Sequence, residues 1–158
     1  MNLSLEGRNA LVCGASQGIG LAAAQELAGL GARVTLLARN DESLKAALGT
    51  LPKVSSGAHD YAVADFSNSD NIGQVAEGLV KSNDFDILIN NTGGPAGGPI
   101  SDADASEFVA TFEQHLLCNH KLVQALLPGM RERGHGRIIN VISTSVKAPL
   151  NNLGVSNT

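Results

Sequence analysis

The sequence is poor in aromatic residues and contains no tryptophan. Aromatic side chains make up 3% of its 158 residues, and its only tyrosine is Tyr61. Proteins that stack bases or sugars rely on aromatic platforms, so this scarcity argues against that class. The net charge of -4 at pH 7 argues the same way, because nucleic acids and anionic membrane surfaces attract basic proteins. We therefore expect neither nucleic acid nor a membrane as a partner.

Long apolar runs and cysteines are also scarce. No run approaches the roughly 20 apolar residues that span a membrane, and the first seven residues lack the apolar core of a secretory signal. Cys13 and Cys118 fall in a predicted strand and a predicted helix, a pattern typical of buried thiols in a reducing compartment. These features predict a cytoplasmic protein. His115 and His120 are five residues apart on a predicted helix and face different ways, so no metal site is expected.

A glycine-rich turn is the most informative motif that is present. Residues Gly14–Gly20 read Gly-Ala-Ser-Gln-Gly-Ile-Gly, between an apolar run over Asn9–Cys13 and good helix formers over Leu21–Ala28. Glycines let a backbone turn tightly and approach a ligand, and the N-terminus of a helix attracts negative charge. Strand, glycine turn and helix together predict a phosphate-binding site; a plain structural turn is the alternative.

Strand and helix patterns alternate along the rest of the chain. Further strands are predicted at 33–38, 60–64, 85–90 and 137–142, and helices at 42–48, 70–82 and 104–133, with a break near Glu113. Asn40 or Asp41 is expected to cap the helix at 42–48. The alternation, without any hairpin signal, predicts an α/β fold: a Rossmann-like, doubly wound parallel sheet with helices on both faces.

The predicted sheet stops after its fifth strand. A six-stranded doubly wound domain needs more strands and helices, and residues 156–158 read as a helix cap with no helix after it. We therefore expect residues 1–158 to form a single dinucleotide-binding domain that is incomplete, as a fragment of a longer protein. An intentionally small protein is the alternative.

Ligands of such sheets bind at the carboxyl ends of the strands. In this sequence those ends carry Gly14–Gly20, Arg39, Asp65, Asn90–Gly93 and Ser143. Arg39 falls where many dinucleotide enzymes place an acid for a ribose hydroxyl, and an arginine there suits a 2′-phosphate. The sequence thus favours NADP over NAD, with a solvated turn arginine as the alternative. Asp65 has the alternative role of capping the turn after its strand.

These motifs resemble those of the short-chain dehydrogenases/reductases, over nearly the whole chain and as the N-terminal part of that fold. Cys13–Gly20 is similar to the family's Thr-Gly-x-x-x-Gly-x-Gly cofactor motif, with Cys for Thr. Asn90–Gly93 is similar to its Asn-Asn-Ala-Gly motif, with Thr for Ala. Leu126–Met130 adds to a likeness to the 3-oxoacyl-(acyl carrier protein) reductase branch. The resemblance implies an NADP-dependent oxidoreductase acting on a carbonyl or alcohol.

The resemblance also implies roles for individual residues. Asp65 matches an aspartate that holds the adenine, and Ser143 matches a serine that hydrogen-bonds the substrate carbonyl. The implied cofactor site comprises Gly14, Ser16, Gln17, Gly18, Ile19, Gly20, Arg39, Asp65, Phe66, Asn91, Thr92 and Gly93. The region matching Glu107–Met130 packs subunits together in the family, which implies a homodimer or homotetramer.

The catalytic positions depart from the family's pattern. Spacing back from Pro128 puts the family's catalytic Asn at His115, unless a different helix register brings Asn119 there. Counting from Ser143 puts its catalytic Tyr at Ser156, and the lysine that follows would lie beyond the chain.

These departures set what we expect of catalysis. The hydroxyl of Ser156 is far less acidic than a phenol, so this chain alone is not expected to catalyse reduction. The imidazole of His115 could carry a proton near neutral pH, or it could be an ordinary packed or solvent-facing histidine. A catalytically inactive nucleotide-binding homologue and a subunit-association module are the alternative functions.

Overall fold

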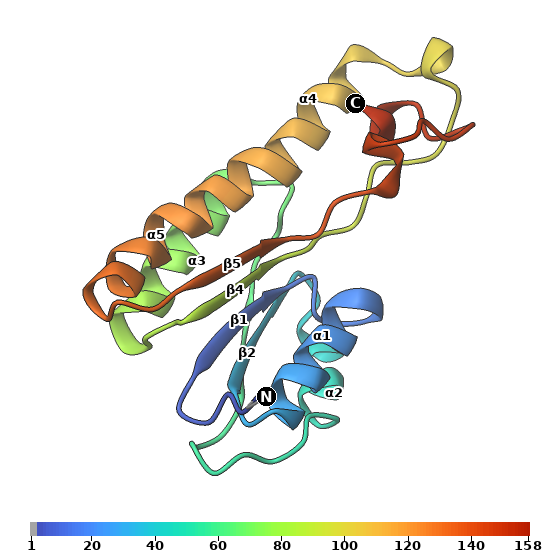
Figure 1. The fold of residues 1–158 in the computed structure, drawn as a ribbon. Helices are drawn as coiled ribbons and strands as arrows, with labels where there is room; N and C mark the ends of the chain where they lie inside the picture. Colours follow the sequence, from blue (N-terminus) through green and yellow to red (C-terminus); the bar gives the residue numbers. More distant parts are fainter. Residues whose placement is uncertain (1–2) are drawn as a thin grey trace.

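A five-stranded parallel sheet forms the centre of the protein in the computed structural model, which describes residues 3–158 (Figure 1). The strands are β1 (Asn9–Cys13), β2 (Arg33–Ala38), β3 (Asp60–Val63), β4 (Ile87–Asn90) and β5 (Arg137–Asn140). Their order is β3-β2-β1-β4-β5, and every neighbouring pair is parallel. The chain therefore winds outward from the middle of the sheet in both directions, which confirms the predicted Rossmann-like α/β fold.

Helices cover both faces of the sheet, as Figure 1 shows. One face carries α1 (Gly18–Gly29) and α2 (Asp41–Leu48), and the other carries α3 (Ser69–Ser82) and α5 (Cys118–Glu132). The helix α4 (Ala105–Phe112) extends beyond the sheet and buries none of its residues. Successive residues of a strand point to opposite faces, so β1 serves both layers. Val12 packs in the cluster under α1 and α2, whereas Leu11 and Cys13 pack under α3 and α5.

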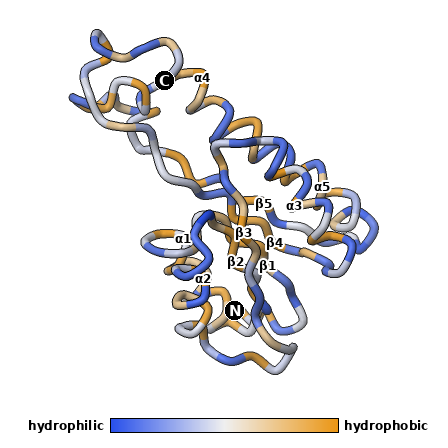
Figure 2. Tube along the Cα trace, turned by 180° about the vertical axis from the view of Figure 1, so that it is seen from behind, coloured by the Kyte–Doolittle hydropathy of each residue, from blue (hydrophilic) through white to orange (hydrophobic). Residues whose placement is uncertain are grey.

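Apolar colour follows the central strands in Figure 2, where the helices combine apolar and polar residues. This distribution is the expected one for parallel strands buried on both faces. Both cysteines are free and buried in this core, as predicted. None of the helices between residues 3 and 158 is long and apolar enough to cross a membrane.

The long helical stretch is not interrupted at Glu113. It continues from α4 into α5 through a π-helical turn, η2 (Glu113–Leu117), so the predicted break is in fact a change of helix type. A π-turn inserts an extra residue into an α-helix and is often found at functional sites. It re-aims the side chains on either side of the inserted residue.

Other boundaries differ from the prediction by a few residues. α1 begins inside the glycine motif, at Gly18, and Asn40 is the residue that caps α2, accepting a hydrogen bond from the Ser43 N–H at 2.8 Å. The fifth strand was predicted to continue to the apolar Ile142. The observed β5 ends at Asn140, because its paired residues with β4 end at Asn140. Short 3-10 turns complete the described structure: η1 (Ile100–Asp102), η3 (Thr144–Val146) and η4 (Val155–Asn157).

The last described residues fold back beside the loop that precedes α4 (Figure 1). The N–H of Gly98 donates to the Asn152 carbonyl at 2.7 Å, and the Gly154 N–H donates to the Gly98 carbonyl at 3.0 Å. This contact places η4 (Val155–Asn157), which contains Ser156, beside α4.

Candidate nucleotide-binding site

A cavity of about 520 Å³ opens at the carboxyl ends of the central strands. The loops that follow β1, β2, β3 and β4 contribute to its wall, together with one residue of the π-helical turn. Its lining residues are Gly14, Ser16, Gln17, Gly18, Ile19, Ala38, Arg39, Asp65, Phe66, Ser67, Asn91, Thr92, Gly93, Gly94 and Gln114. The structure thus brings together every predicted cofactor residue except Gly20, which lies behind the wall.

The glycines of the turn after β1 have different physical roles. Gly14 and Gly18 have φ angles of +58° and +57°, a conformation that side chains other than glycine adopt at a cost. Gly20 has an ordinary φ, but a Cβ added there would collide with the Gly14 carbonyl oxygen. Gly20 therefore allows α1 to pack closely against the end of β1.

The N-terminus of α1 is open to a ligand. Its N-cap residue, Gln17, makes no side-chain capping hydrogen bond. The first N–H groups of a helix have no partner within the helix, and the helix dipole concentrates positive potential there. The cavity wall at Gln17 and Gly18 is therefore suited to an anionic group such as a phosphate.

Asn91 connects the glycine turn to the loop after β4. Its Nδ2 donates to the carbonyls of Cys13 and Gly14, at 3.3 and 3.4 Å. The neighbouring Asn90 is structural, because its Nδ2 donates at 2.8 Å to Oδ1 of Asn140 across the β4–β5 pair. These two amides hold three strand ends together at the cavity.

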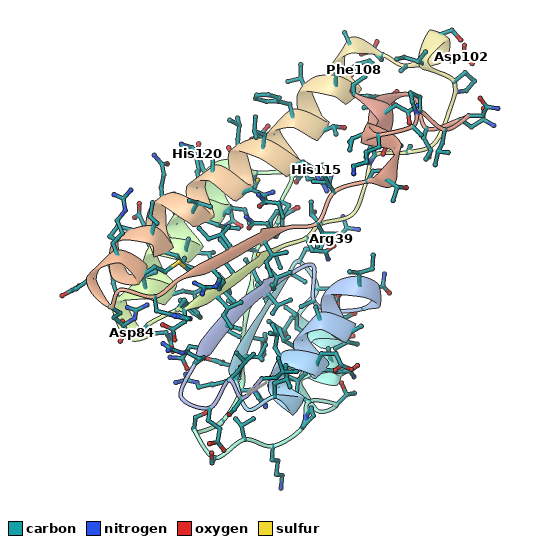
Figure 3. All side chains as sticks on the ribbon, viewed as in Figure 1. Arg39, Asp84, Asp102, Phe108, His115 and His120 are labelled. Atoms are coloured by element: carbon teal, nitrogen blue, oxygen red, sulfur yellow. The ribbon has the colours of Figure 1, made fainter. Side chains whose placement is uncertain are left out.

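Arg39 and Asp65 place opposite charges at the cavity. The Ser67 N–H donates to Oδ1 of Asp65 at 2.9 Å, so Asp65 does cap the turn after β3 as well as line the cavity. This hydrogen bond, together with the nearby Arg39 guanidinium, keeps the pKa of Asp65 below its usual range. Figure 3 places Arg39 beside the turn between β1 and α1.

His115 lies in the π-helical turn and points inward. Figure 3 shows it directed toward the segments that follow β4 and β5, whereas His120 projects from the outer side of the helix. Burial lowers the pKa of His115, against the opposing effect of the Gly93 carbonyl. Nε2 of His115 and Oδ1 of Asn119, one turn on, are both buried without a hydrogen-bond partner. Burial therefore favours the neutral imidazole, which keeps one unsatisfied nitrogen among the described residues.

Ser143 and Ser156 are brought together by a residue that was not predicted, Ser145. The Ser145 hydroxyl donates to the Ser156 carbonyl at 2.9 Å, and its oxygen lies 2.6 Å from that of Ser143. Because a carbonyl only accepts, the single proton of Ser145 is used there, so Ser143 must be the donor in the hydroxyl pair. Ser143 also accepts from the Ser145 N–H at 3.1 Å.

This arrangement limits what the serines offer a ligand. The hydroxyl proton of Ser143 is engaged, which leaves an acceptor lone pair rather than the donor that a substrate carbonyl needs. Ser156 takes part through its backbone and not through its hydroxyl. Within residues 3–158, no hydrogen bond joins these serines to His115, so the three predicted catalytic residues do not form one hydrogen-bonded set.

Four residues of the cavity wall were missed by the sequence-based prediction: Ala38, Ser67, Gly94 and Gln114. The first three adjoin predicted residues and follow from them. Gln114 belongs to a helix, and only the π-helical turn aims it at the cavity. Thr92 is the sequence signal that could have indicated Gln114. The family's Asn-Asn-Ala-Gly motif has an alanine methyl group at this position, and the hydroxyl of Thr92 requires a polar partner.

A larger groove, of about 810 Å³, lies elsewhere, between the outer faces of α3 and α5. Asp70 and Lys121 pair across it, and Gln124 lies on its wall. This groove is remote from the glycine turn, so the larger volume does not mark the candidate nucleotide-binding site. Among residues 3–158 no three His, Cys, Asp or Glu side chains gather into a metal-binding group.

Known proteins share this architecture and sequence. The family model of the short chain dehydrogenases matches residues 8–155. The chain is 32% identical over 148 residues to 17-beta-hydroxysteroid dehydrogenase type 3 of Danio rerio, covering 90% of this chain and 48% of that protein. It is 32% identical over 145 residues to inactive hydroxysteroid dehydrogenase-like protein 1 of Homo sapiens, covering 90% and 44%. The chain thus spans about half the length of these curated relatives.

Solved structures agree with the sequence matches. L-sorbose reductase from Gluconobacter frateurii, in complex with NADPH and L-sorbose, superposes with a TM-score of 0.91 at 30% identity. The match covers 99% of this chain and 60% of that one. With its parallel sheet, its glycine turn and a family match along nearly its whole length, this chain belongs to the short-chain dehydrogenase family of oxidoreductases.

Proposed function

We propose that this chain is the NADP-binding part of an oxidoreductase that transfers hydride to or from a carbonyl or alcohol. The observation that carries the proposal is the cavity at the strand ends, which is lined by the glycine turn, by Arg39 and Asp65, and by the loop Asn91–Gly93. The family match supports the reaction class, and the NADPH complex of the sorbose reductase supports the cofactor.

The residues present fit a dinucleotide phosphate. The uncapped N-terminus of α1 would hold the pyrophosphate, and the backbone at Gly14 and Gly18 allows it to approach. Arg39 would hold a 2′-phosphate, since a guanidinium suits phosphate oxygens. Asp65 would contact the adenine. The bound cofactor would supply the hydride.

Calorimetric titration with NADPH and with NADH tests this assignment. We expect saturable binding that is tighter for NADPH, because only NADPH carries the 2′-phosphate. Arg39→Ala should weaken NADPH binding by about tenfold or more and leave NADH binding unchanged, as expected for one charge-assisted contact. Arg131→Ala, an exposed arginine of α5, is the matched control. Equal affinity for the two cofactors would refute the NADP preference.

Binding without chemistry is the second candidate for this chain by itself. The Ser143 proton is engaged by Ser145, and Ser156 offers a carbonyl in place of a phenol. One relative that this chain matches is named as an inactive hydroxysteroid dehydrogenase-like protein. We expect these 158 residues to bind NADPH without consuming it on a panel of carbonyl compounds. Turnover in a longer preparation, lost in Ser143→Ala, would count against this candidate.

The proposal also covers the subunit contact and the cellular location of the protein. Val109, Phe112 and Leu116 form an exposed apolar stripe along α4 and the π-helical turn. We propose that this stripe, within Glu107–Met130, joins subunits into a homodimer or homotetramer. The buried free thiols Cys13 and Cys118 favour a cytoplasmic location.

A further inference from the structure

The side-chain amide of Gln114 bridges a helix and the cavity loop. Its Nε2 donates to Oγ1 of Thr92 at 3.0 Å and to the carbonyl of Gly93 at 2.8 Å. All three residues line the cavity of about 520 Å³. The amide therefore uses its two N–H groups to fix the position of the segment after β4.

The same helical turn also holds the loop after β3. Oε1 of Glu113 accepts from the Ser69 N–H at 3.2 Å, and the Cys118 thiol donates to the Phe66 carbonyl at 3.3 Å. The extra residue of the π-turn lets adjacent side chains reach two different loops. Of Glu113, Gln114 and Cys118, Gln114 is the one whose own side chain lines the cavity.

The contact with Gln114 determines which hydrogen bond the Thr92 hydroxyl can still make to a ligand. Its oxygen accepts from Gln114, and within residues 3–158 its own hydroxyl proton is donated to no protein group. A hydroxyl held as an acceptor on one side has its proton free for the other. The Thr92 hydroxyl is therefore suited to donate a hydrogen bond to an acceptor oxygen of a ligand.

We propose that Gln114 is a positioning residue that orients the Thr92 hydroxyl as a donor to an acceptor oxygen of the bound cofactor. The inference rests on the proposed NADP-binding function. It also explains why Thr92, rather than the alanine of the resembling motif, stands in this loop: Thr92 and Gln114 form a complementary pair.

A double-mutant cycle tests the pair, with NADPH dissociation constants measured by calorimetry for Thr92→Ala, Gln114→Met and the double variant. We expect each single variant to bind about fivefold more weakly, the effect of one net hydrogen bond. The double variant should bind no more weakly than Gln114→Met, because Gln114 acts through Thr92. Gln124→Met, on the same continuous helix but in the α3–α5 groove, should bind as wild type does. Wild-type affinity in Gln114→Met, or effects that multiply, would overturn the proposal.

The source of the acceptor oxygen is resolved by a second probe, 2′-phospho-ADP-ribose, which lacks the nicotinamide. If Thr92→Ala weakens its binding as it weakens that of NADPH, the acceptor is a phosphate or ribose oxygen of the 2′-phospho-ADP-ribose part. If the loss is confined to NADPH, the acceptor is the carboxamide. Both results uphold the proposal, whereas no loss with either probe contradicts it.

Amide hydrogen exchange in the ligand-free protein keeps the test independent of the proposed function. The amides of residues 91–94 should exchange about tenfold faster in Gln114→Met than in wild type. In Gln124→Met they should exchange at the wild-type rate. If wild type bound no NADPH, the proposed function would fail while this exchange still decided whether Gln114 holds the loop. Identical exchange in Gln114→Met and wild type refutes the positioning role.

Discussion

Single residues at the glycine turn set how closely a ligand can approach the sheet. Gly14 and Gly18 supply the positive φ angles, and Gly20 supplies the space in which the Gly14 carbonyl lies. The motif was recognisable from sequence because each requirement leaves a glycine at a fixed spacing. Ser145 was not recognisable, since nothing local distinguishes a loop serine that is 0% exposed.

Gly20→Ala tests the close approach of α1. The added methyl would collide with backbone, which cannot move aside, so we expect stability to fall by about 1–3 kcal/mol and NADPH binding to be lost. Gly29→Ala in the same helix is the control, because a Cβ there meets nothing within 4 Å. It should leave binding intact and be neutral or stabilising by up to about 1 kcal/mol. Chemical denaturation and calorimetry measure both effects, and equal behaviour of the two variants would contradict the packing role of Gly20.

His115→Gln tests the burial of the imidazole through pH. Because the pKa of His115 is lowered in the folded protein, the unfolded chain binds the proton more readily. The free energy of unfolding should therefore fall as pH decreases from the ordinary histidine value of about 6.5 towards the lowered one. The stability of wild type relative to His115→Gln should decrease over that window. Urea denaturation at a series of pH values measures it, with the exposed His120→Gln alongside; a constant difference would mean that His115 is solvated.

At the scale of elements, the π-helical turn decides which side chains reach the cavity. The sequence indicated an irregularity near Glu113 but not its form, because an apolar pattern cannot tell a break from an inserted residue whose placement depends on tertiary contacts. Strand cores were predictable from buried apolar runs, whereas the end of β5 was not. Its apolar residues continue to Ile142, which is 71% exposed, beyond the last pairing with β4.

The cap of α2 gives an element-scale prediction. Oδ1 of Asn40 satisfies the Ser43 N–H at the start of the helix, directly after Arg39. Asn40→Ala should lower the free energy of unfolding by about 1 kcal/mol. Asn40→Asp should lower it by much less, because an aspartate side chain also caps a helix well. Thermal and urea denaturation measure the change. An alanine variant as stable as wild type would show that the cap does not contribute.

At the scale of the whole molecule, two of the apolar surfaces that residues 3–158 leave exposed bear on association. One is the stripe on α4 and the π-helical turn, where Phe112 is 55% exposed; the other is the sheet edge at β5, where Ile139 is 51% exposed. An uncovered, apolar edge strand is prone to association. The 17-beta-hydroxysteroid dehydrogenase type 3 that it matches is about twice as long as this chain.

Sedimentation velocity distinguishes the two surfaces. Phe112→Asp should convert a defined dimer or tetramer to monomer, because a charge in an apolar contact is costly. Ile139→Lys should instead suppress larger, concentration-dependent species, since lysine on an edge strand blocks pairing. If Phe112→Asp left the oligomer unchanged, the helical surface would not be the subunit contact.

The central claim, that the strand-end cavity holds the cofactor, is tested most directly by mapping backbone amide shifts by NMR as NADPH is added. We predict saturable shifts confined to the glycine turn Gly14–Gly20, Arg39, the segment Asp65–Ser67 and the loop Asn91–Gly94, which carry most of the residues that line the cavity. Shifts in the α3–α5 groove, or none at saturating NADPH, would contradict the account.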